Sequence, residues 1–437
     1  MKVLYLGYVW PEPASSAAGG RTLEILRCLR ERDWTVIYAS AAALSPHRFE
    51  LQSLGIEECS IAVNDDGFDA LLMQQQPDIV FFDRFFTEEQ FGWHVEKNCP
   101  RAVRVLDTCD LHSLREARQV LLKSQLQQTQ DWQPASYVET VAVMRQSDTC
   151  LREVAAILRC DLSLIISNFE YELLSVEFGV PSYLMQVNRL MASQLEPPSN
   201  LSANHVIDFE QRSDFLSIGN FRHAPNWDAV LCLKQQIWPK IRQRLPQAQL
   251  RVYGAYPPPK ALQLHRPREG FQVLGWADDA LAVMRQARVC LAPLRFGAGI
   301  KGKLADAMQT GTPSVTTSLG AEGMDLGMTW GGAVSDNFEE FAAAAVQLYS
   351  DRLRWQRAQE QGWNLFTQLF DREGDRTHLL KALESLQCDL ESQRARNFVG
   401  AMLRHHSLKS TQYMSQWISL KNKLQVEKAA GEQSLKE

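Results

Sequence analysis

The chain has 437 residues, of which 45% are hydrophobic and 22% charged. This length is too great for one ordinary core and predicts a globular protein of two or three domains. The formal net charge of −5 shows that the chain as a whole is not basic, as proteins that bind nucleic acids or membrane surfaces often are. Such binding would require a local basic patch. The nine scattered cysteines match no metal-ligand spacing, no apolar run approaches the roughly twenty residues that span a bilayer, and no signal-peptide region precedes the first strand. We therefore expect a cytoplasmic protein with reduced thiols, no metal and no membrane span.

The chain opens with a strand, turn, helix, strand pattern. Residues 2–6 form a short apolar strand, Gly19 and Gly20 precede a helix expected over 21–32, and residues 34–39 supply the next strand. Such a βαβ unit builds a parallel sheet. The glycine pair stands outside a strand end, where ligands bind in these sheets, although the full dinucleotide fingerprint is missing.

A polar cluster follows a later strand. Strands are expected at 61–63, 78–82 and 103–106, and the last of these continues into Asp107, Asp110 and His112. Loops at strand ends carry function, so His112 is a candidate to bind a sugar hydroxyl or shuttle a proton, oriented by Asp107 or Asp110. The alternative is that Asp110 only caps a helix starting near residue 111 and that His112 is merely exposed.

The rest of the first half is helical and ends in a linker. Residues 114–158 have helical composition and form an expected insertion, broken near 132–135, before a strand at 162–166 and a helix at 169–178. Glu170 in that helix's first turn is explained by the helix dipole without a catalytic role. We place the first domain at 1–190 and a polar linker at 191–213.

A second α/β series follows at 214–380. Strands are expected at 215–218, 250–253, 271–274 and 289–294, with a loop at 219–226 and a helix at 227–236. Strands that alternate with helices again predict a mainly parallel sheet. The fold class is therefore α/β, with two Rossmann-like domains and a helical C-terminal extension at 381–437.

A glycine-rich turn follows the strand at 289–294. It contains Gly297 and Gly299, is followed by Lys301 and Lys303, and leads into a helix expected at 304–309 and a strand at 313–317. Glycines let backbone N–H groups approach a ligand, and the lysines add charge at a helix N-terminus. The site suits a phosphate or diphosphate. Alternatively, the glycines shape a tight connection and the lysines are solvated.

The C-terminal extension is unusually basic. Residues 393–428 hold seven lysines and arginines against the single acid Glu427, interleaved with aromatic residues. This mixture is suited to RNA, an anionic acceptor or another chain. The alternative is an amphipathic helix that keeps its basic face solvated. Its docking residues on the body would then be Phe398, Met402, Met414, Trp417 and Ile418.

Several motifs carry a family likeness. The segments GNFRHAPNWDAV at 219–230, APLRFGAGIKGKLADAM at 292–308 and GTPSVTTSLGAEGM at 311–324, with strand ends at Gly254 and Gly275, resemble the nucleotide-sugar domain of GT-B fold glycosyltransferases of family four. The first half agrees through its glycine pair and the segment DTCDLHSLR at 107–115. The likeness covers roughly residues 1–380.

The resemblance implies two Rossmann-like domains that close on a nucleoside-diphosphate sugar, held mostly by the second domain, with an unidentified acceptor in the first. It implies a hexosyltransferase type of reaction with retention of anomeric configuration and no metal or other cofactor. Lys301, Lys303 and Arg222 would neutralise the departing diphosphate. Asp306 would hold the nucleotide ribose and His112 would stand near the reacting centre, while Gly19 and Gly20 would approach the diphosphate.

The sequence also departs from the family pattern. Pro225 stands near the position of a usual phosphate-binding lysine, and Ala298 replaces the glutamate that usually opens a paired-glutamate motif. Two other functions are consistent with the sequence: a sugar-nucleotide sensor without catalysis, and a transferase that acts on a nucleic acid such as tRNA through residues 393–428.

Overall fold

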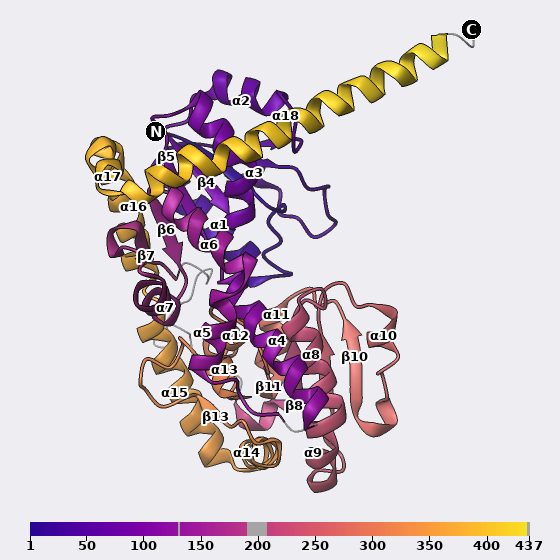
Figure 1. The fold of residues 1–437 in the computed structure, drawn as a ribbon. Helices are drawn as coiled ribbons and strands as arrows, with labels where there is room; N and C mark the ends of the chain where they lie inside the picture. Colours follow the sequence, from indigo (N-terminus) through magenta and orange to yellow (C-terminus); the bar gives the residue numbers. More distant parts are fainter. Residues whose placement is uncertain (130–131, 190–207, 435–437) are drawn as a thin grey trace.

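The computed structural model describes residues 1–129, 132–189 and 208–434. Two parallel sheets, each covered by helices, lie one above the other in Figure 1. The first sheet has the strand order β3-β2-β1-β4-β5-β6-β7 and the second has the order β10-β9-β8-β11-β12-β13. Every ladder between neighbouring strands is parallel, as the alternation of strands and helices predicts.

The first domain has seven strands and seven α-helices among the described residues. Its strands are β1 (Lys2–Gly7), β2 (Thr35–Ser40), β3 (Glu57–Ser60), β4 (Ile79–Asp83), β5 (Val103–Asp107), β6 (Leu162–Ile165) and β7 (Met185–Val187). Its helices are α1 (Ala17–Arg30), α2 (Gly67–Gln75), α3 (Phe85–Asn98), α4 (His112–Gln128), α5 (Tyr137–Arg145), α6 (Asp148–Arg159) and α7 (Asn168–Phe178). Helices α4, α5 and α6 lie between β5 and β6, where the insertion is expected.

The second domain follows the linker, most of which lies outside the described residues. Its strands are β8 (Ser213–Ile218), β9 (Leu250–Tyr253), β10 (Phe271–Gly275), β11 (Ala287–Ala292), β12 (Ser314–Thr316) and β13 (Gly332–Val334). Its helices are α8 (Ala224–Cys232), α9 (Trp238–Arg244), α10 (Pro259–Leu262), α11 (Ala280–Gln286), α12 (Gly302–Gln309), α13 (Ser318–Ala321), α14 (Phe338–Ser350) and α15 (Arg352–Leu369). A short π-helical stretch at Leu233–Ile237 joins α8 to α9.

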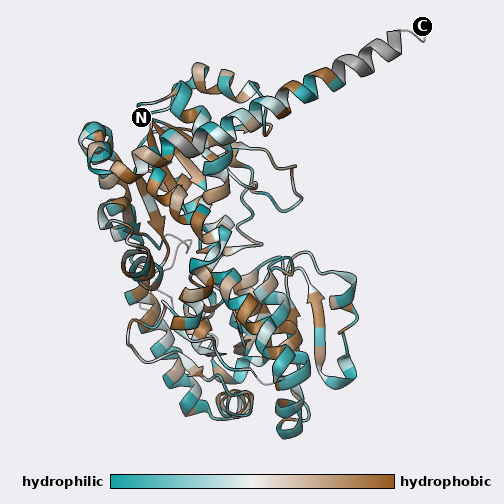
Figure 2. Ribbon diagram, viewed as in Figure 1, coloured by the Kyte–Doolittle hydropathy of each residue, from teal (hydrophilic) through white to brown (hydrophobic). Residues whose placement is uncertain are grey.

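Each sheet is buried on both faces because successive side chains of a strand point to opposite sides. In β1, Leu4 packs into one core and Val3 and Tyr5 into the other. In β8, Phe215 and Leu216 divide in the same way. The brown strands between teal helix surfaces in Figure 2 show this burial.

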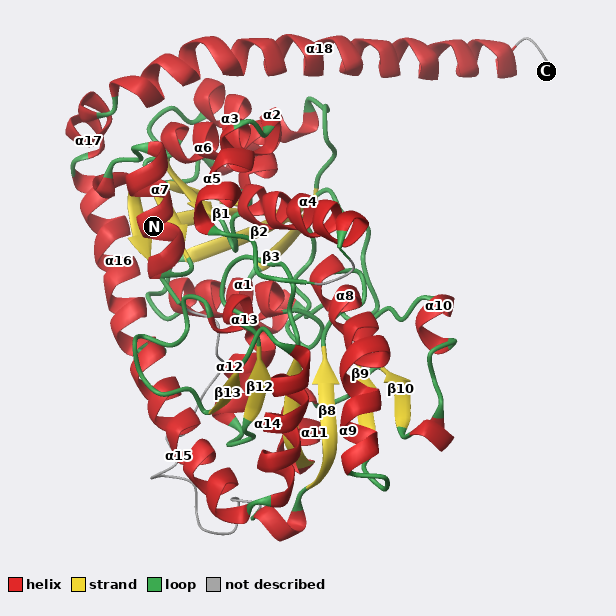
Figure 3. Cartoon of the chain, turned by 60° about the horizontal axis from the view of Figure 1, so that its bottom comes forward, coloured by secondary structure: helices red, strands yellow, loops and turns green. Residues whose placement is uncertain are grey.

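The chain returns to the first domain after α15. Helix α16 (Arg372–Cys388) crosses the expected boundary at residue 380 and buries Leu379 and Leu383 in the first domain's core. At its start, Arg372 pairs with Glu24 of α1. Helices α17 (Leu390–Arg396) and α18 (Phe398–Ser434) follow, and α18 packs against α3 and α6. Figure 1 shows α18 crossing the first domain, and Figure 3 shows it on the side of that domain that faces away from the second.

Three sequence predictions of local structure need correction. The third strand lies at Glu57–Ser60 and not at 61–63, because residues 57–60 are the ones that pair in parallel with residues 37–40 of β2. Helix α1 begins at Ala17 and not at residue 21, since the Ser16 hydroxyl caps it by accepting from Gly19 N. Helix α8 begins at Ala224 with a proline in its first turn, so part of the expected loop at 219–226 is helical.

Candidate functional site

The candidate site lies between the domains, at the carboxyl ends of the strands of both sheets. The turn after β5 faces the glycine-rich turn after β11, and the two domains touch there. Arg118 of α4 extends this contact, because its guanidinium pairs with Glu322 and donates to the Gly297 carbonyl oxygen at 2.8 Å. Ligands of open α/β sheets bind at strand carboxyl ends, so this edge is where the chemistry is expected.

Gly299 is the closest point of the glycine-rich turn to the first domain. Its φ of +64° favours glycine, and a Cβ atom built on it would lie 2.8 Å from the Cβ of Asp110. Its N–H donates to Glu170 Oε1 at 2.8 Å, and its carbonyl oxygen accepts from Lys301 Nζ at 2.7 Å. In this structure Gly297 and Gly299 therefore join the domains.

The two lysines have different surroundings. Lys301 is only 8% exposed, and burial lowers its pKa to about 8, partly offset by the charge of Glu322. Lys303 is half-buried at the start of α12 and donates to Asn226 Oδ1 at 2.8 Å. Burial also lowers its pKa to about 8. Lys303 thus keeps some exposed surface, whereas Lys301 is held inside the turn.

Asp306 lies one helical turn after Lys303, so both side chains share a face of α12. Burial raises the pKa of its carboxyl group to about 7. Within the described part of the chain, no side chain or N–H group forms a hydrogen bond or ion pair with this half-buried carboxyl group. A carboxylate in this state can accept hydrogen bonds from a ligand hydroxyl pair.

His112 and Asp110 form the first domain's part of the site. His112 Nε2 lies 3.6 Å from Asp110 Oδ1, and Asp110 also pairs with Arg115. Burial lowers the pKa of His112 to about 4, which the charge of Asp110 only partly offsets. Burial alone would raise the pKa of Asp110, but Arg115 and His112 hold it well below its usual range. The ring is therefore neutral and the carboxylate charged near pH 7.

Asp107, Gly19 and Gly20 are engaged in contacts within the first domain. Asp107 has no exposed surface and pairs with the buried Arg21 at 2.9 Å, so its carboxylate is occupied inside the fold and supports the site from behind. Gly19 and Gly20 lie in the first turn of α1 and not in a loop before it. A Cβ on Gly19 would lie 2.5 Å from the Glu12 carbonyl oxygen, so close chain packing requires glycine there.

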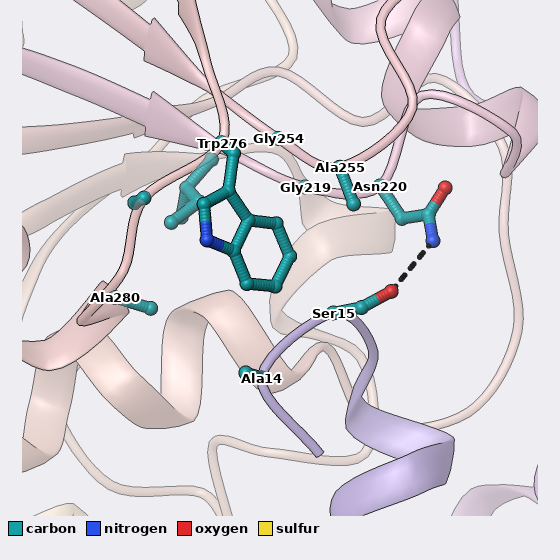
Figure 4. A pocket seen from close by; sticks show the side chains of 10 residues that line it. Ala14, Ser15, Gly219, Asn220, Gly254, Ala255, Trp276 and Ala280 are labelled. Carbon is teal, nitrogen blue, oxygen red and sulfur yellow. Dashed lines mark hydrogen bonds between the residues drawn. The ribbon is translucent and has the colours of Figure 1, made fainter. Parts of the chain in front are cut away.

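A second part of the cleft lies at the ends of β8, β9 and β10. A small pocket there has an empty volume of about 260 Å³ that includes its open mouth. Figure 4 shows its lining, with Asn220 Nδ2 donating across the domains to Ser15 Oγ at 3.0 Å. The Trp276 indole faces this space, as Figure 4 shows. Its ring stacks on the His47 imidazole of the first domain, with the ring centres 3.9 Å apart. Arg222 lies at the same end, 3.6 Å from the centre of the Tyr256 ring.

Sequence reasoning missed several residues of this cleft. Glu170 is buried and bridges Gly299 N and Leu111 N, with its Oε2 atom unpartnered. Burial, reinforced by Asp110, raises its pKa to about 8. His223 lies near Asp110 and Lys303, and burial lowers its pKa to about 4. The signal for His223 and Trp276 was their position in loops that follow strands. Glu170 had no sequence signal beyond its place in the first turn of a helix.

The described residues contain no group of three or more His, Cys, Asp or Glu side chains that could hold a metal ion. Within the described ranges, none of the helices is both long enough and apolar enough to cross a bilayer.

Comparison with known proteins gives a domain family and a fold. Residues 212–351 match the family model described as glycosyl transferases group 1. No curated protein matches the chain. The solved structure of sucrose-phosphate synthase from Thermosynechococcus elongatus is similar, with a TM-score of 0.63 and 14% identity over 88% of this chain and 99% of that one.

Two further structures have the same two-domain arrangement. HepE from Anabaena in complex with UDP aligns with a TM-score of 0.61 and 13% identity over 88% of this chain and all of that one. A glycosyltransferase from Rickettsia africae aligns with a TM-score of 0.60 and 12% identity over 88% and 98% of the two chains. These likenesses confirm the GT-B fold predicted from the motifs.

Proposed function

We propose that this glycosyltransferase, whose residues 212–351 belong to the glycosyl transferases group 1 family, transfers a sugar from a nucleoside-diphosphate donor to an acceptor with retention of anomeric configuration. The observation that carries the proposal is that Lys303 and Asp306 lie on one face of α12, one helical turn apart, after the glycine-rich turn that contacts the first domain. A cation and a carboxylate one turn apart suit a diphosphate and a ribose on the same ligand.

A nucleotide sugar is supported as donor by the structural neighbours. HepE has been solved with UDP and with UDP-glucose. In this chain, the Trp276 face and the pocket beside it offer a stacking surface for a base. One face of the Trp276 ring is stacked on His47 of the first domain, so the base would use the side of the ring that faces the pocket.

The chemistry follows from where charge develops. The bond between the anomeric carbon and the diphosphate oxygen breaks, and the acceptor oxygen forms its bond to that carbon on the same face. The acceptor proton passes to the departing diphosphate. Lys303 and Lys301 stabilise the negative charge that builds on the diphosphate, in a site where burial strengthens the interaction.

His112 and Asp110 occupy the acceptor side in this proposal. A neutral imidazole has one nitrogen that donates a hydrogen bond and one that accepts, so it can bind a sugar hydroxyl in either role. An imidazolium can only donate. Asp110, kept ionised by Arg115, fixes the ring's orientation. The reaction as proposed uses no metal and no other cofactor.

A thermal-shift screen with nucleoside-diphosphate sugars tests the donor. A donor that binds only the folded state raises the melting temperature by mass action. We expect at least one uridine or other nucleoside-diphosphate sugar to stabilise the protein, and Lys303→Ala to remove the shift. The absence of a shift across the panel would contradict the proposal.

Turnover separates an enzyme from a sensor. Donor hydrolysis or transfer is expected with the donor that the screen selects. Tight binding without release of nucleoside diphosphate, with any acceptor class supplied, would instead assign the chain to the sensor function.

A further inference from the structure

The outer face of α18 carries an apolar stripe that no part of the described chain covers. We define the outer stripe as Tyr413, Trp417, Leu420 and Leu424, which are 64%, 63%, 58% and 50% exposed. Their spacing of four, three and four residues places them on one side of a helix. Figures 1 and 3 show α18 lying across the first domain with its C-terminal part beyond the body.

Small polar residues fill the opposite side. Ser415 and Ser419, two residues before and after Trp417, are 5% and 9% exposed and face the body. Near its start, Arg404 fixes α18 by donating to the Arg159 carbonyl oxygen at 3.0 Å. Buried serines and polar contacts thus line the docked side of the helix, while most of its large apolar side chains are turned outward.

This arrangement corrects the sequence interpretation of the helix. Four of the five expected docking side chains are exposed, namely Phe398 (77%), Met402 (47%), Met414 (60%) and Trp417 (63%). The apolar face expected to bind the body is therefore available to a partner.

The charged side chains that α18 itself carries around the outer stripe have one sign. Residues 398–425 contain no Asp or Glu, whereas Lys409 and Lys421 are exposed beside the stripe. Lys421 Nζ lies 5.4 Å from the centre of the Trp417 ring. Lys423 lies on the flank and reaches Asp66 of the first domain at 2.5 Å. A partner of this surface must bury the apolar side chains of the outer stripe and must also carry negative charge to pair with the lysines.

We propose that the outer stripe binds the surface of an anionic lipid bilayer and that α18 lies in the plane of its headgroups. Aromatic and aliphatic side chains with lysines at the edge are the pattern of interfacial helices. The lysines extend from the stripe, so their alkyl chains can stay in the apolar layer while their charges reach the headgroups.

Two other partners fit the surface less well. Single-stranded nucleic acid is bound through aromatic stacking, whereas Leu420, Leu424 and Met414 offer no ring to a base. A second copy would bring the acid-free α18 helices of both chains together, so that like charges repel. A bilayer with negative headgroups satisfies both the apolar and the charged side chains.

Vesicle flotation of the full chain tests this surface. Vesicles of phosphatidylcholine mixed with phosphatidylglycerol should carry the protein to the top of a density gradient, and vesicles of phosphatidylcholine alone should carry less. The triple variant Trp417→Ser, Leu420→Ser, Leu424→Ser should bind at least about tenfold more weakly. Lys421→Gln should weaken binding about fivefold, and added salt should reduce the difference between the two lipids.

A matched control removes exposed apolar groups elsewhere. Val176 on α7 and Leu353 on α15 are 75% and 66% exposed, so Val176→Ser with Leu353→Ser should float like the wild type. Unchanged melting temperatures in all variants will show that folding is intact.

Three outcomes would overturn the proposal. The first is equal flotation of the triple variant and the wild type. The second is binding to a single-stranded RNA oligonucleotide that the triple variant loses, without flotation. The third is a concentration-dependent dimer that the triple variant abolishes. None of these changes donor binding in the cleft, so the proposed transferase function stands or falls separately.

Discussion

The Glu170 carboxyl group in the first domain accepts a hydrogen bond from the Gly299 N–H in the second domain, at 2.8 Å. The same oxygen accepts from Leu111 N at 3.1 Å, beside the loop that holds Asp110. The buried Glu170 carboxyl group thus occupies a backbone N–H of the turn that we assign to the donor diphosphate. The Gly299 N–H therefore serves the contact between the domains and also belongs to the proposed anion site.

Glu170 should make stability depend on pH. Its pKa rises from the ordinary value of 4.5 to about 8 in the folded chain, chiefly by burial. The folded state therefore holds a proton that the unfolded state has lost, and this contribution is complete below pH 4.5 and lost as pH rises through 8. The shift corresponds to about 3–5 kcal/mol.

Chemical denaturation of Glu170→Gln at several pH values measures this effect. The variant's amide oxygen can still accept from Gly299 N, so its free energy of unfolding should fall less than that of the wild type between pH 5 and about 8.5. Parallel pH profiles for the two proteins would show that Glu170 does not titrate in this range.

Lys303→Ala should reduce sugar transfer by about two to three orders of magnitude, because a principal charge on the departing diphosphate is lost. Single-turnover measurements with the donor chosen by thermal shift will report the chemical step. Lys240→Ala is the matched control, since Lys240 pairs with Glu339 at the surface of the second domain. Near-normal turnover in the Lys303 variant would exclude it from the mechanism.

Affinity for a nucleoside diphosphate should have a bell-shaped pH dependence. Asp306 ionises at about 7, so affinity rises through that pH, while Lys301 and Lys303 lose charge above about 8, so affinity falls there. Titration calorimetry with UDP across pH 6–10 tests both limbs. Lys303→Arg should move the alkaline limb upward because guanidinium stays charged. A flat profile would contradict the assignment.

Asp306→Asn should weaken binding of a ribonucleotide about 10- to 100-fold, as expected for hydrogen bonds to a charged group. The matched ligand is the corresponding 2′,3′-dideoxynucleotide, which has no ribose hydroxyls to donate. Wild type and variant should bind that ligand equally in the same calorimetric assay. An equal loss for both ligands would mean that Asp306 acts on structure or phosphate and not on the ribose.

Leu383→Ala should lower the free energy of unfolding by about 2–5 kcal/mol, because Leu383 is fully buried where α16 covers the first domain. Leu353→Ala removes the same atoms from a side chain that is 66% exposed and should change stability by less than about 0.5 kcal/mol. Urea denaturation of both variants provides the comparison. Similar values would mean that α16 is dispensable for the first domain.

Local pattern alone determined most of the fold. The apolar runs of β1, β5, β9 and β11 lie within about two residues of their predicted bounds, since most residues of these strands are apolar and short apolar runs predict buried strands. The glycine-rich turn with Lys301 and Lys303, and its likeness to a nucleotide-sugar domain, were likewise readable because spacing within a turn and one helix is a local property.

Only the tertiary structure decided which groups meet across distance. Glu170 and Gly299 are 129 residues apart, and nothing in either local sequence indicates that they form a hydrogen bond. The sequence likewise does not indicate that Asp107 pairs with Arg21 and is buried away from the cleft surface. Nor does it indicate that the Trp417 side chain points outward. Periodicity identifies an apolar face of a helix, but only packing determines whether the body or another surface covers it.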